Sequence, residues 1–319
     1  MSPQPTLPEY SRFRYGPRLP FRGLRRRAQF AIAWVFGLVA RLLPVRASQW
    51  AGKWLGRLLY PLASRDRSIC AYQLRLAFPA MTEEQRSAIA RGCFENLGMT
   101  LWEVFAISTM RRDLRRWVGL EGEEDLRKAH AQGRGVILVT GHMANWELLG
   151  LAFEQLDIAA NAVVRSIENP LLDDLLLRNR ESTHLKFFHR GSKESPRRLL
   201  QCLREGNVLV VALDHDTVAP GVFVDFFGMP ANTPRVAASL ALRLGVPIVT
   251  GFDRREDGGT HCFRFRRVDY PPELENNAAG VMRVTQLLSD AMEAHIRQYP
   301  HQWTWNHRRW KRRAPDPSP

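Results

Sequence analysis

From residue 135 onward, short apolar runs alternate with longer segments of helical periodicity, and this alternation restricts the fold more than any other feature. The runs GVILVT (135–140) and NVLVVALD (207–214) are apolar at nearly every position rather than at every second one. A strand with that pattern is buried on both faces. Further strands are expected at 161–166, 185–190, 246–252 and 261–270. Buried strands separated by helices predict an α/β fold with a largely parallel central sheet flanked by helices.

Helix signals occupy the segments between these runs. The clearest lies at 82–106, where Thr82 can cap the helix and Glu83 and Glu84 fall in its first turn. Other helices are expected near 145–156, 170–183, 194–205 and 277–298, and one more is opened by Thr233 and Pro234. The apolar segment VFVDFFGMPANTP (222–234) is predicted to be a loop that either lines an apolar ligand channel or covers the core.

The size of the chain suits one large α/β domain with additional segments at its ends. It has 319 residues, of which 45% are hydrophobic, and can therefore bury a sizeable core. We expect a basic flexible lead (1–27), a membrane-associating helical segment (28–65), the α/β domain (66–313) and a disordered tail (314–319).

The positive charge of the chain is concentrated at its two ends. The formal net charge is +14, but residues 1–60 carry +10 and residues 297–319 carry +5, so that the remainder is close to neutral. A nucleic-acid-binding protein usually carries its positive charge on the folded face that follows the phosphates. Basic ends beside apolar segments favour an anionic membrane surface instead, and we expect no nucleic-acid partner.

Two amino-terminal segments are candidates for membrane attachment. FAIAWVFGLVA (30–40) has eleven uninterrupted apolar residues, which as a helix cover about 16 Å, roughly half of a hydrocarbon core. SQWAGKWLGRLLYPL (48–62) is amphipathic and contains tryptophan, as interfacial helices do. These segments could lie at the interface, span part of the bilayer or form a buried helix pair. If the first segment inserts, the basic residues that precede it are expected to keep the α/β domain on the cytoplasmic face of the membrane.

The four cysteines give no indication of a metal site. They are widely separated, and none belongs to a C-x-x-C motif or a His/Cys cluster. Reduced thiols in the core are expected, at Cys70, Cys93, Cys202 and Cys262. We predict no bound metal and no cofactor, and the sequence gives no indication of oligomeric state.

His142 and Glu147 lie between an apolar strand and an apolar helix. Five residues of helix turn through about 500°, so the two side chains would not share one helix face. The spacing suits a helix that begins between them, with His142 in the turn after the strand, Asn145 as N-cap and Glu147 in the first turn. In that arrangement Glu147 can fix the tautomer of His142 and stabilise the imidazolium that forms when the histidine takes a proton from a hydroxyl.

The segment GHMANWEL (141–148) resembles the H-x-x-x-x-[DE] motif of the glycerolipid acyltransferases, in the form found in the lipid A biosynthesis lauroyl and myristoyl acyltransferases. The resemblance extends over about residues 30–312. It is carried in the same order by segments at 71–86, 94–103, 163–180, 203–216, 222–249 and 302–311.

The resemblance implies a membrane-associated enzyme that moves a fatty acyl chain from an acyl thioester, on acyl carrier protein or coenzyme A, to a hydroxyl of a lipid A-type glycolipid precursor. His142 would be the general base and Glu147 its orienting carboxylate. No G-x-S-x-G motif is present, so direct transfer without an acyl-enzyme is expected. Two alternatives stay open. The acceptor could be a lysophospholipid or another bacterial glycolipid, or the protein could be a catalytically silent membrane lipid-binding protein.

Other positions that match the family are expected near the same site. Arg165 ends the strand that follows the His142 segment and could bind a phosphate or the developing oxyanion. Asp214 and Asp216 alternate at a strand end, so at most one of them faces the crevice and holds Arg165. Asn145 is grouped with these as a substrate-binding or oxyanion residue. His215 is expected to point away.

The carboxyl-terminal segment QWTWNHRRWKRR (302–313) combines tryptophans with a basic cluster. Aromatic and cationic side chains together suit a lipid headgroup surface. We therefore expect Trp303 and Trp305 to lie at the membrane, the alternative being a final strand followed by a solvated basic end.

Overall fold

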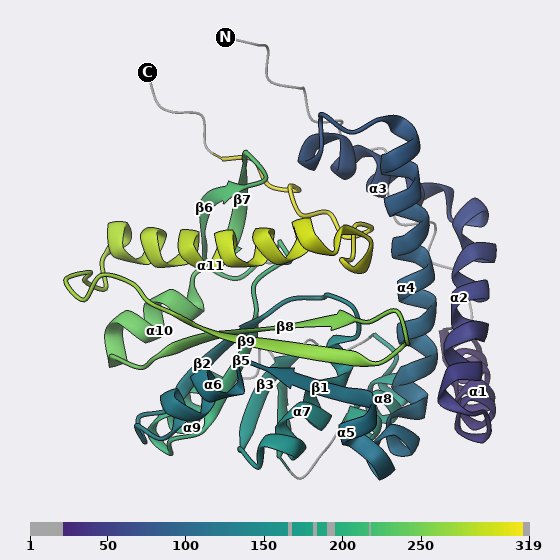
Figure 1. Ribbon diagram of the computed structural model, residues 1–319, viewed down its shortest axis with the longest axis horizontal. Helices are drawn as coiled ribbons and strands as arrows, with labels where there is room; N and C mark the ends of the chain where they lie inside the picture. Colours follow the sequence, from purple (N-terminus) through teal and green to yellow (C-terminus); the bar gives the residue numbers. More distant parts are fainter. Residues whose placement is uncertain (1–21, 165–167, 181–183, 190–194, 217, 315–319) are drawn as a thin grey trace.

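The computed structural model describes residues 22–164, 168–180, 184–189, 195–216 and 218–314. These residues form a seven-stranded sheet in the order β1-β9-β8-β2-β5-β3-β4 (Figure 1). The strands are β1 Val118–Glu121, β2 Val136–Thr140, β3 Ala160–Val164, β4 Leu185–His189, β5 Val208–Ala212, β8 Ile248–Arg255 and β9 His261–Val268. Neighbouring strands are parallel except β8 and β9, which are antiparallel. The predicted α/β fold with a largely parallel sheet is therefore confirmed.

The two faces of the sheet carry separate hydrophobic cores, because successive residues of a strand point to opposite faces. On β2, Ile137 and Val139 belong to one core, whereas Val136 and Leu138 belong to the other. The first core is covered by α9 Ser195–Arg204, α10 Val236–Leu244 and α11 Ala278–Gln298. The second is covered by α6 Glu123–His130 and α7 Leu149–Leu156. Burial on both faces explains why these strands are apolar at nearly every position.

The segment predicted as a loop at 222–234 is a β-hairpin. Its strands, β6 Gly221–Phe226 and β7 Met229–Pro234, are antiparallel and form a separate two-stranded sheet. Phe227 and Gly228 make the turn with φ values of 57° and 75°, the positive values that a two-residue hairpin turn requires. Phe227 is buried in the first core, so the hairpin covers the core.

The prediction that Thr233 and Pro234 open a helix was wrong. Both residues end β7, and α10 begins only at Val236. Strand β1 was not predicted, because its four residues are too few to show a pattern. The cap at Thr82 is confirmed, since its hydroxyl accepts a hydrogen bond from the backbone N–H of Gln85.

Four helices form one side of the molecule, at the right of Figure 1. They are α1 Arg22–Leu42, α2 Val45–Leu62, α3 Ser64–Ala77 and α4 Glu83–Met110. Helix α1 therefore begins inside the stretch predicted to be a flexible lead. Among the described residues, no helix is both long enough and apolar enough to cross a membrane. The remaining helical segments are η2 Arg111–Asp113, α5 Leu114–Trp117, η3 Trp146–Leu148, α8 Pro170–Arg180 and η4 Pro300–Gln302.

Helices α2 and α4 pack backbone to backbone at three glycines. A Cβ atom added to Gly98 would lie 2.1 Å from the carbonyl oxygen of Gly52, and one added to Gly56 would lie 2.1 Å from that of Phe94. Real Cβ atoms do not approach backbone so closely, so the two helices can lie this near only because these positions lack side chains.

We expect Gly98→Ala to destabilise the protein by about 1–3 kcal/mol, because the two helices must separate to admit the methyl group. Thermal unfolding measures the effect. The control is Gly258→Ala, where an added Cβ would meet no atom within 4 Å. Equal unfolding temperatures for the two variants would contradict the close packing of α2 on α4.

Candidate active site

Two adjacent parallel strands bring His142 and Asp214 together. Thr140 at the end of β2 is paired in register with Ala212 at the end of β5. His142 and Asp214 each lie two residues further along, at the carboxyl edge of the sheet, where open α/β sheets bind ligands. The Asp214 carboxylate accepts two hydrogen bonds from His142, one from the backbone N–H at 2.7 Å and one at Nδ1 at 2.8 Å.

Asp214 is completely buried, whereas 26% of the His142 side chain is exposed. Burial by itself favours the protonated acid, but the neighbouring His142 and His215 and the hydrogen bonds from His142 lower the pKa of Asp214 well below its ordinary value. Trp303 also donates its indole N–H to Asp214 Oδ2 at 2.9 Å. A buried carboxylate of this kind holds the proton on Nδ1 of the imidazole and directs Nε2 away from the protein interior.

The helix does begin between His142 and Glu147, as the spacing predicted. Asn145 is the N-cap of η3, and its side-chain oxygen accepts a hydrogen bond from the backbone N–H of Glu147 at 3.2 Å. The Glu147 carboxylate accepts the indole N–H of Trp146 at 3.0 Å. The carboxylate that the structure places at Nδ1 of His142 is that of Asp214, where the sequence had suggested Glu147. An orienting role for Glu147 stays a prediction.

The other predicted site residues lie in different surroundings. Asn145 is fully buried, and its amide donates to Glu103 Oε2 at 2.8 Å. Asp216 accepts hydrogen bonds from the side chain of Asn232 and from the backbone N–H of Arg312, both at 3.0 Å. Of the two alternating acids, Asp214 is therefore the one that contacts His142. Arg165 lies outside the described residues.

His215 does not point away from the site, and that prediction was wrong. Its ring stacks on His142 with the centroids 3.8 Å apart and an interplanar angle of 6°. On its other side it stacks on His307, 3.6 Å away. The alternation of side chains along a strand does not apply here, because β5 ends at Ala212 and the chain turns.

His215, the middle ring of this stack, and His307, on its far side from His142, both have lowered pKa values. Burial lowers the pKa of His215 well below its ordinary value, and the nearby His142, His307 and Arg309 act in the same direction against Asp214. Burial, together with the neighbouring His142 and Arg309, lowers the pKa of His307 to about 4. The two rings beyond His142 in the stack therefore compete weakly for a proton, and the stacking limits how far the His142 ring can rotate.

Among the described residues, one group has the composition of a metal site. His142, Asp214 and His215 each offer a ligand atom, and these atoms lie within 4.8 Å of one another. A metal ion binds in the plane of an imidazole ring, along the nitrogen lone pair. The two histidine rings are stacked and nearly parallel, so their lone pairs do not converge on one point, and we invoke no metal in the chemistry.

The carboxyl-terminal tryptophans contribute to the core rather than to a lipid surface. Trp303, Trp305 and Trp310 are at most 1% exposed and belong to the first core. The expectation of a headgroup surface was wrong for Trp303 and Trp305, because they fold back over the end of β2, where Trp303 forms a bridge with Met143. Trp303 and His307 are parts of the site that sequence reasoning missed. The sequence signal that could have indicated their burial was the alternation of polar residues with Trp303 and Trp305.

The thiols are unsuited to form an acyl-enzyme. All four cysteines are free, and Cys70, Cys93 and Cys202 are buried as predicted, whereas Cys262 is only half-buried. A hydrogen bond with Cys93 and burial raise the pKa of Cys70, and burial raises the pKa of Cys202 to about 11. The reactive thiolate is therefore scarce at neutral pH. The arrangement at the sheet edge supports general-base chemistry at His142 Nε2.

Comparison with known proteins assigns the chain to a family. Residues 20–312 match the family described as bacterial lipid A biosynthesis acyltransferase. The lipid A biosynthesis lauroyltransferase of Escherichia coli (strain K12) is 29% identical over 274 residues, 85% of this chain and 87% of that protein. The lipid A biosynthesis palmitoleoyltransferase of the same organism is 28% identical over 276 residues, again 85% of this chain and 87% of that protein. The phosphatidylinositol mannoside acyltransferase of Mycobacterium tuberculosis (strain CDC 1551 / Oshkosh) is 28% identical over 68% of each chain. The chain thus belongs to the bacterial lipid A biosynthesis acyltransferase family and is an acyltransferase.

Proposed function

We propose that the protein transfers a fatty acyl chain from a thioester of acyl carrier protein to a hydroxyl of a lipid A-type glycolipid precursor. The observation that carries the proposal is the pairing of His142 with the buried carboxylate of Asp214 at the carboxyl edge of the sheet. That pairing supplies a general base in a chain whose family acts in lipid A biosynthesis.

In the proposed reaction, His142 Nε2 removes the proton of the acceptor hydroxyl. At the same time the hydroxyl oxygen forms a bond to the carbonyl carbon of the thioester. Asp214 stabilises the imidazolium that results. The tetrahedral adduct then collapses, the carbon–sulfur bond breaks, and the imidazolium gives its proton to the leaving thiolate. In this proposal Arg165 binds the developing oxyanion or a phosphate of the acceptor.

The relatives support a second candidate acceptor. The Mycobacterium tuberculosis relative is named for acylation of phosphatidylinositol mannoside, which is a different glycolipid. Acyl transfer measured with purified protein, using lauroyl thioesters of acyl carrier protein and of coenzyme A, separates the donors. Mass spectrometry of total lipids from cells with and without the protein identifies the acceptor, since the missing acyl chain marks it. Unchanged lipids together with no detected transfer would contradict the proposal and favour the alternative of a catalytically silent lipid-binding protein.

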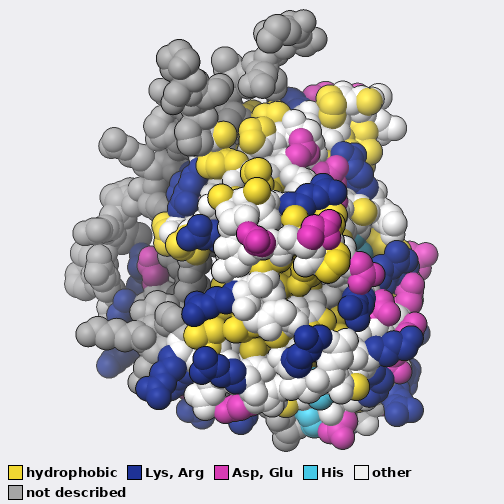
Figure 2. Space-filling view, turned by 90° about the vertical axis from the view of Figure 1, so that its left-hand side faces the viewer, with side chains coloured by type: hydrophobic (Ala, Val, Ile, Leu, Met, Phe, Trp, Pro, Cys, Tyr) yellow, Lys and Arg dark blue, Asp and Glu magenta, His cyan; other side chains and the backbone are white. Residues whose placement is uncertain are grey.

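We also propose that α1 and α2 attach the protein to the cytoplasmic face of the inner membrane. Of the sixteen large hydrophobic side chains that are exposed among the described residues, twelve lie on these two helices. They include Trp34, Trp50 and Trp54, the residue type that suits a membrane–water interface. The opposite face of the molecule carries Lys, Arg, Asp and Glu side chains interspersed over its surface (Figure 2).

The proposed membrane face lies one helix away from the site. Helix α2 packs on α4, and α4 contacts the His142 turn through Asn96 and Thr100, which both donate to the carbonyl oxygen of Ala144. Gln49 of α2 donates to Glu103 at 2.7 Å, and Glu103 in turn accepts a hydrogen bond from Asn145. An acceptor held in the membrane would therefore meet the site at short range.

We expect Trp50→Glu combined with Leu58→Glu to release the protein from anionic vesicles, because two apolar side chains that are 66% and 64% exposed would no longer enter the bilayer. Each such burial is worth about 1.5–3 kcal/mol, so binding should weaken at least roughly tenfold. Activity on acceptor in vesicles should fall with binding, whereas activity on acceptor dispersed in detergent should persist. Sedimentation with vesicles and both assays measure the effect.

The control for this experiment is Met282→Glu, which places the same charge on an exposed apolar position of α11. It should leave vesicle binding unchanged. High salt alone should release little of the unaltered protein, since apolar burial is not screened as charge is. Full vesicle binding by the double variant would place the membrane contact elsewhere.

A further inference from the structure

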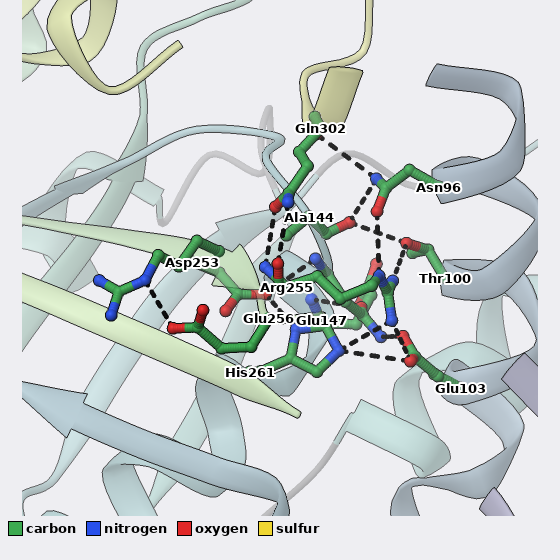
Figure 3. Close-up of polar contacts among 12 residues, drawn as sticks. Asn96, Thr100, Glu103, Ala144, Glu147, Asp253, Arg255, Glu256, His261 and Gln302 are labelled. Atoms are coloured by element: carbon green, nitrogen blue, oxygen red, sulfur yellow. Dashed lines mark hydrogen bonds and ion pairs between the residues drawn. The ribbon is translucent and has the colours of Figure 1, made fainter. Parts of the chain in front are cut away.

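Four ionisable side chains gather near Ala144, which lies in the turn after β2, and the reaction described above does not use them (Figure 3). They are Glu103 on α4, Asp253 and Arg255 on β8, and His261 on β9. Glu103, His261 and Asp253 are at most 2% exposed, and the Arg255 side chain is 7% exposed. Removing so many charges from water is unfavourable unless they are paired and fully hydrogen-bonded. We refer to these four residues as the buried charge cluster.

Each acid of the buried charge cluster is paired with a base, although the two bases also lie 3.0 Å apart and Asp253 Oδ1 has no hydrogen-bond partner. The Arg255 guanidinium donates to Glu103 Oε1, and His261 lies with Nδ1 2.7 Å from Asp253 Oδ2 and Nε2 3.3 Å from Glu103 Oε1. Burial and Arg255 oppose the imidazolium, but the two carboxylates outweigh them and raise the pKa of His261. Burial likewise opposes ionisation of Glu103, but Arg255 and His261 lower its pKa. Two acids are thus balanced by two bases.

Both acids of the cluster also bind Asn145, three residues after His142. Glu103 uses Oε1 for the bases and Oε2 for the Asn145 amide, which donates to it at 2.8 Å. Asp253 Oδ2 accepts the backbone N–H of Asn145 at 2.9 Å. Two hydrogen bonds to carboxylates therefore fix one fully buried residue of the turn, and such charge-assisted bonds are stronger than neutral ones.

Ala144, which lies between His142 and Asn145 in this turn, has a strained backbone. Its φ is +46°, a left-handed value that residues with a Cβ avoid. Its N–H donates to the carbonyl oxygen of Gln302 at 2.8 Å, and its own carbonyl accepts from Asn96 at 3.0 Å and Thr100 at 2.8 Å. Such a conformation persists only where the surroundings over-determine it. Asn96, Thr100 and Glu103 share one face of α4, because they are spaced by four and three residues.

We propose that the buried charge cluster is the positioning element for the catalytic base, and that Asn145 is the residue through which it acts. The two acids fix Asn145 directly, and Arg255 donates to Asn96 at 3.2 Å and to Thr100 at 3.4 Å, the two side chains that bind the Ala144 carbonyl. The cluster thereby sets where the turn leaves β2, and hence where the His142 imidazole meets Asp214. The cluster touches no substrate in this proposal. The inference rests on the proposed function in one respect, namely that His142 is the base.

A charge exchange between Glu103 and Asn145 tests this directly. Asn145→Asp places a carboxylate next to that of Glu103, so that the two repel. Glu103→Gln removes one of the two acids that pair with Arg255 and His261. In the double variant the acid has moved from position 103 to position 145. The amide at position 103 can donate to the carboxylate at position 145, and the total charge of the region equals that of the original protein. Aspartate is also a good helix N-cap, so η3 keeps its cap.

Two readouts separate positioning from a general effect on folding. The first is the NMR signal of the His142 Nδ1 proton, assigned by its loss in His142→Ala, which reports the hydrogen bond to Asp214. The second is kcat and KM for acyl transfer, expressed per folded protein. Each single variant should shift the NMR signal and lower kcat by roughly 10- to 100-fold with little change in KM. The double variant should restore the signal and bring kcat back to within about threefold of the original protein.

The control is Glu154→Gln on α7, which neutralises a partly buried acid paired with Arg111 at 3.0 Å, away from the turn. It should leave the His142 signal and kcat unchanged. If Glu103→Gln does not fold, Asp253→Asn serves in its place, because it removes the charge from the group that accepts the Asn145 backbone N–H. An unshifted His142 signal in the folded single variants, or a double variant as impaired as the worse single one, would overturn the proposal.

The NMR readout does not require activity. If the unaltered protein transfers no acyl chain but the His142 signal shifts and recovers as expected, the proposed function fails while the structural coupling holds. If transfer is normal and the signal does not respond to the variants, the positioning role fails and the function stands.

Discussion

Replacement of His142 by alanine is expected to abolish acyl transfer while the protein stays folded and bound to vesicles. Removing a general base typically lowers the rate by about 10²- to 10⁴-fold. The side chain is 26% exposed at the sheet edge, and its loss leaves the two hydrophobic cores intact. Acyl transfer per folded protein measures the effect, with circular dichroism and vesicle sedimentation as controls. A loss of less than about tenfold would remove His142 from the mechanism.

Asp214→Asn should give the second large effect, about 10²-fold or more, since the amide keeps the shape of the carboxylate but loses the charge that stabilises the imidazolium. The amide can also donate to Nδ1 rather than accept from it, which favours the wrong tautomer of His142. Binding of the donor should persist, so that kcat falls while KM changes little. Steady-state kinetics with an acyl thioester donor measure both constants.

Glu147→Gln is the matched comparison for Asp214→Asn. If the carboxylate at Nδ1 is the one that matters, Glu147→Gln should lower kcat less than Asp214→Asn does. A larger loss from Glu147→Gln would return the orienting role to the residue that the sequence motif suggested. Aggregation of Glu147→Gln without loss of specific activity would make Glu147 a helix-start residue only.

The strands that could be predicted from sequence are those with a continuous apolar pattern. Strand β2 is the clearest, because every one of its residues is buried. Helix α4 was equally clear at its start, where Thr82 can cap the helix and Glu83 and Glu84 fall in its first turn; the structure adds that Thr82 and Gln85 form a capping box. The β6–β7 hairpin was read as a loop because its turn, Phe227 and Gly228, lacks the usual Asn-Gly or Asp-Gly pair.

The site could be predicted only where it is local in sequence. The turn from His142 to Glu147, with Asn145 as cap, follows from spacing within six residues. The contact of His142 with Asp214 joins residues 72 positions apart. It depends on β5 lying next to β2, although β3 and β4 come between them in the chain. Strand order in a parallel sheet cannot be read from the spacing of residues, so this pairing became visible only in the fold.

The buried charge cluster was missed for a related reason. Glu103, Arg255 and His261 each look like ordinary charged residues in the sequence, because nothing local shows that they are buried. Glu103 lies on a helix that was correctly predicted, but its neighbours come from β8 and β9. Charge pairing across distant elements is a property of the tertiary structure.

The carboxyl-terminal segment completes the site, with Trp303 on Asp214, His307 stacked on His215 and Arg312 bonded to Asp216. Each of these contacts reaches from the carboxyl-terminal segment to the residues that follow β5. The site is therefore complete only when this segment has packed back onto the sheet. A protease cut just before Trp303 would separate the sheet from the groups that contact Asp214, His215 and Asp216.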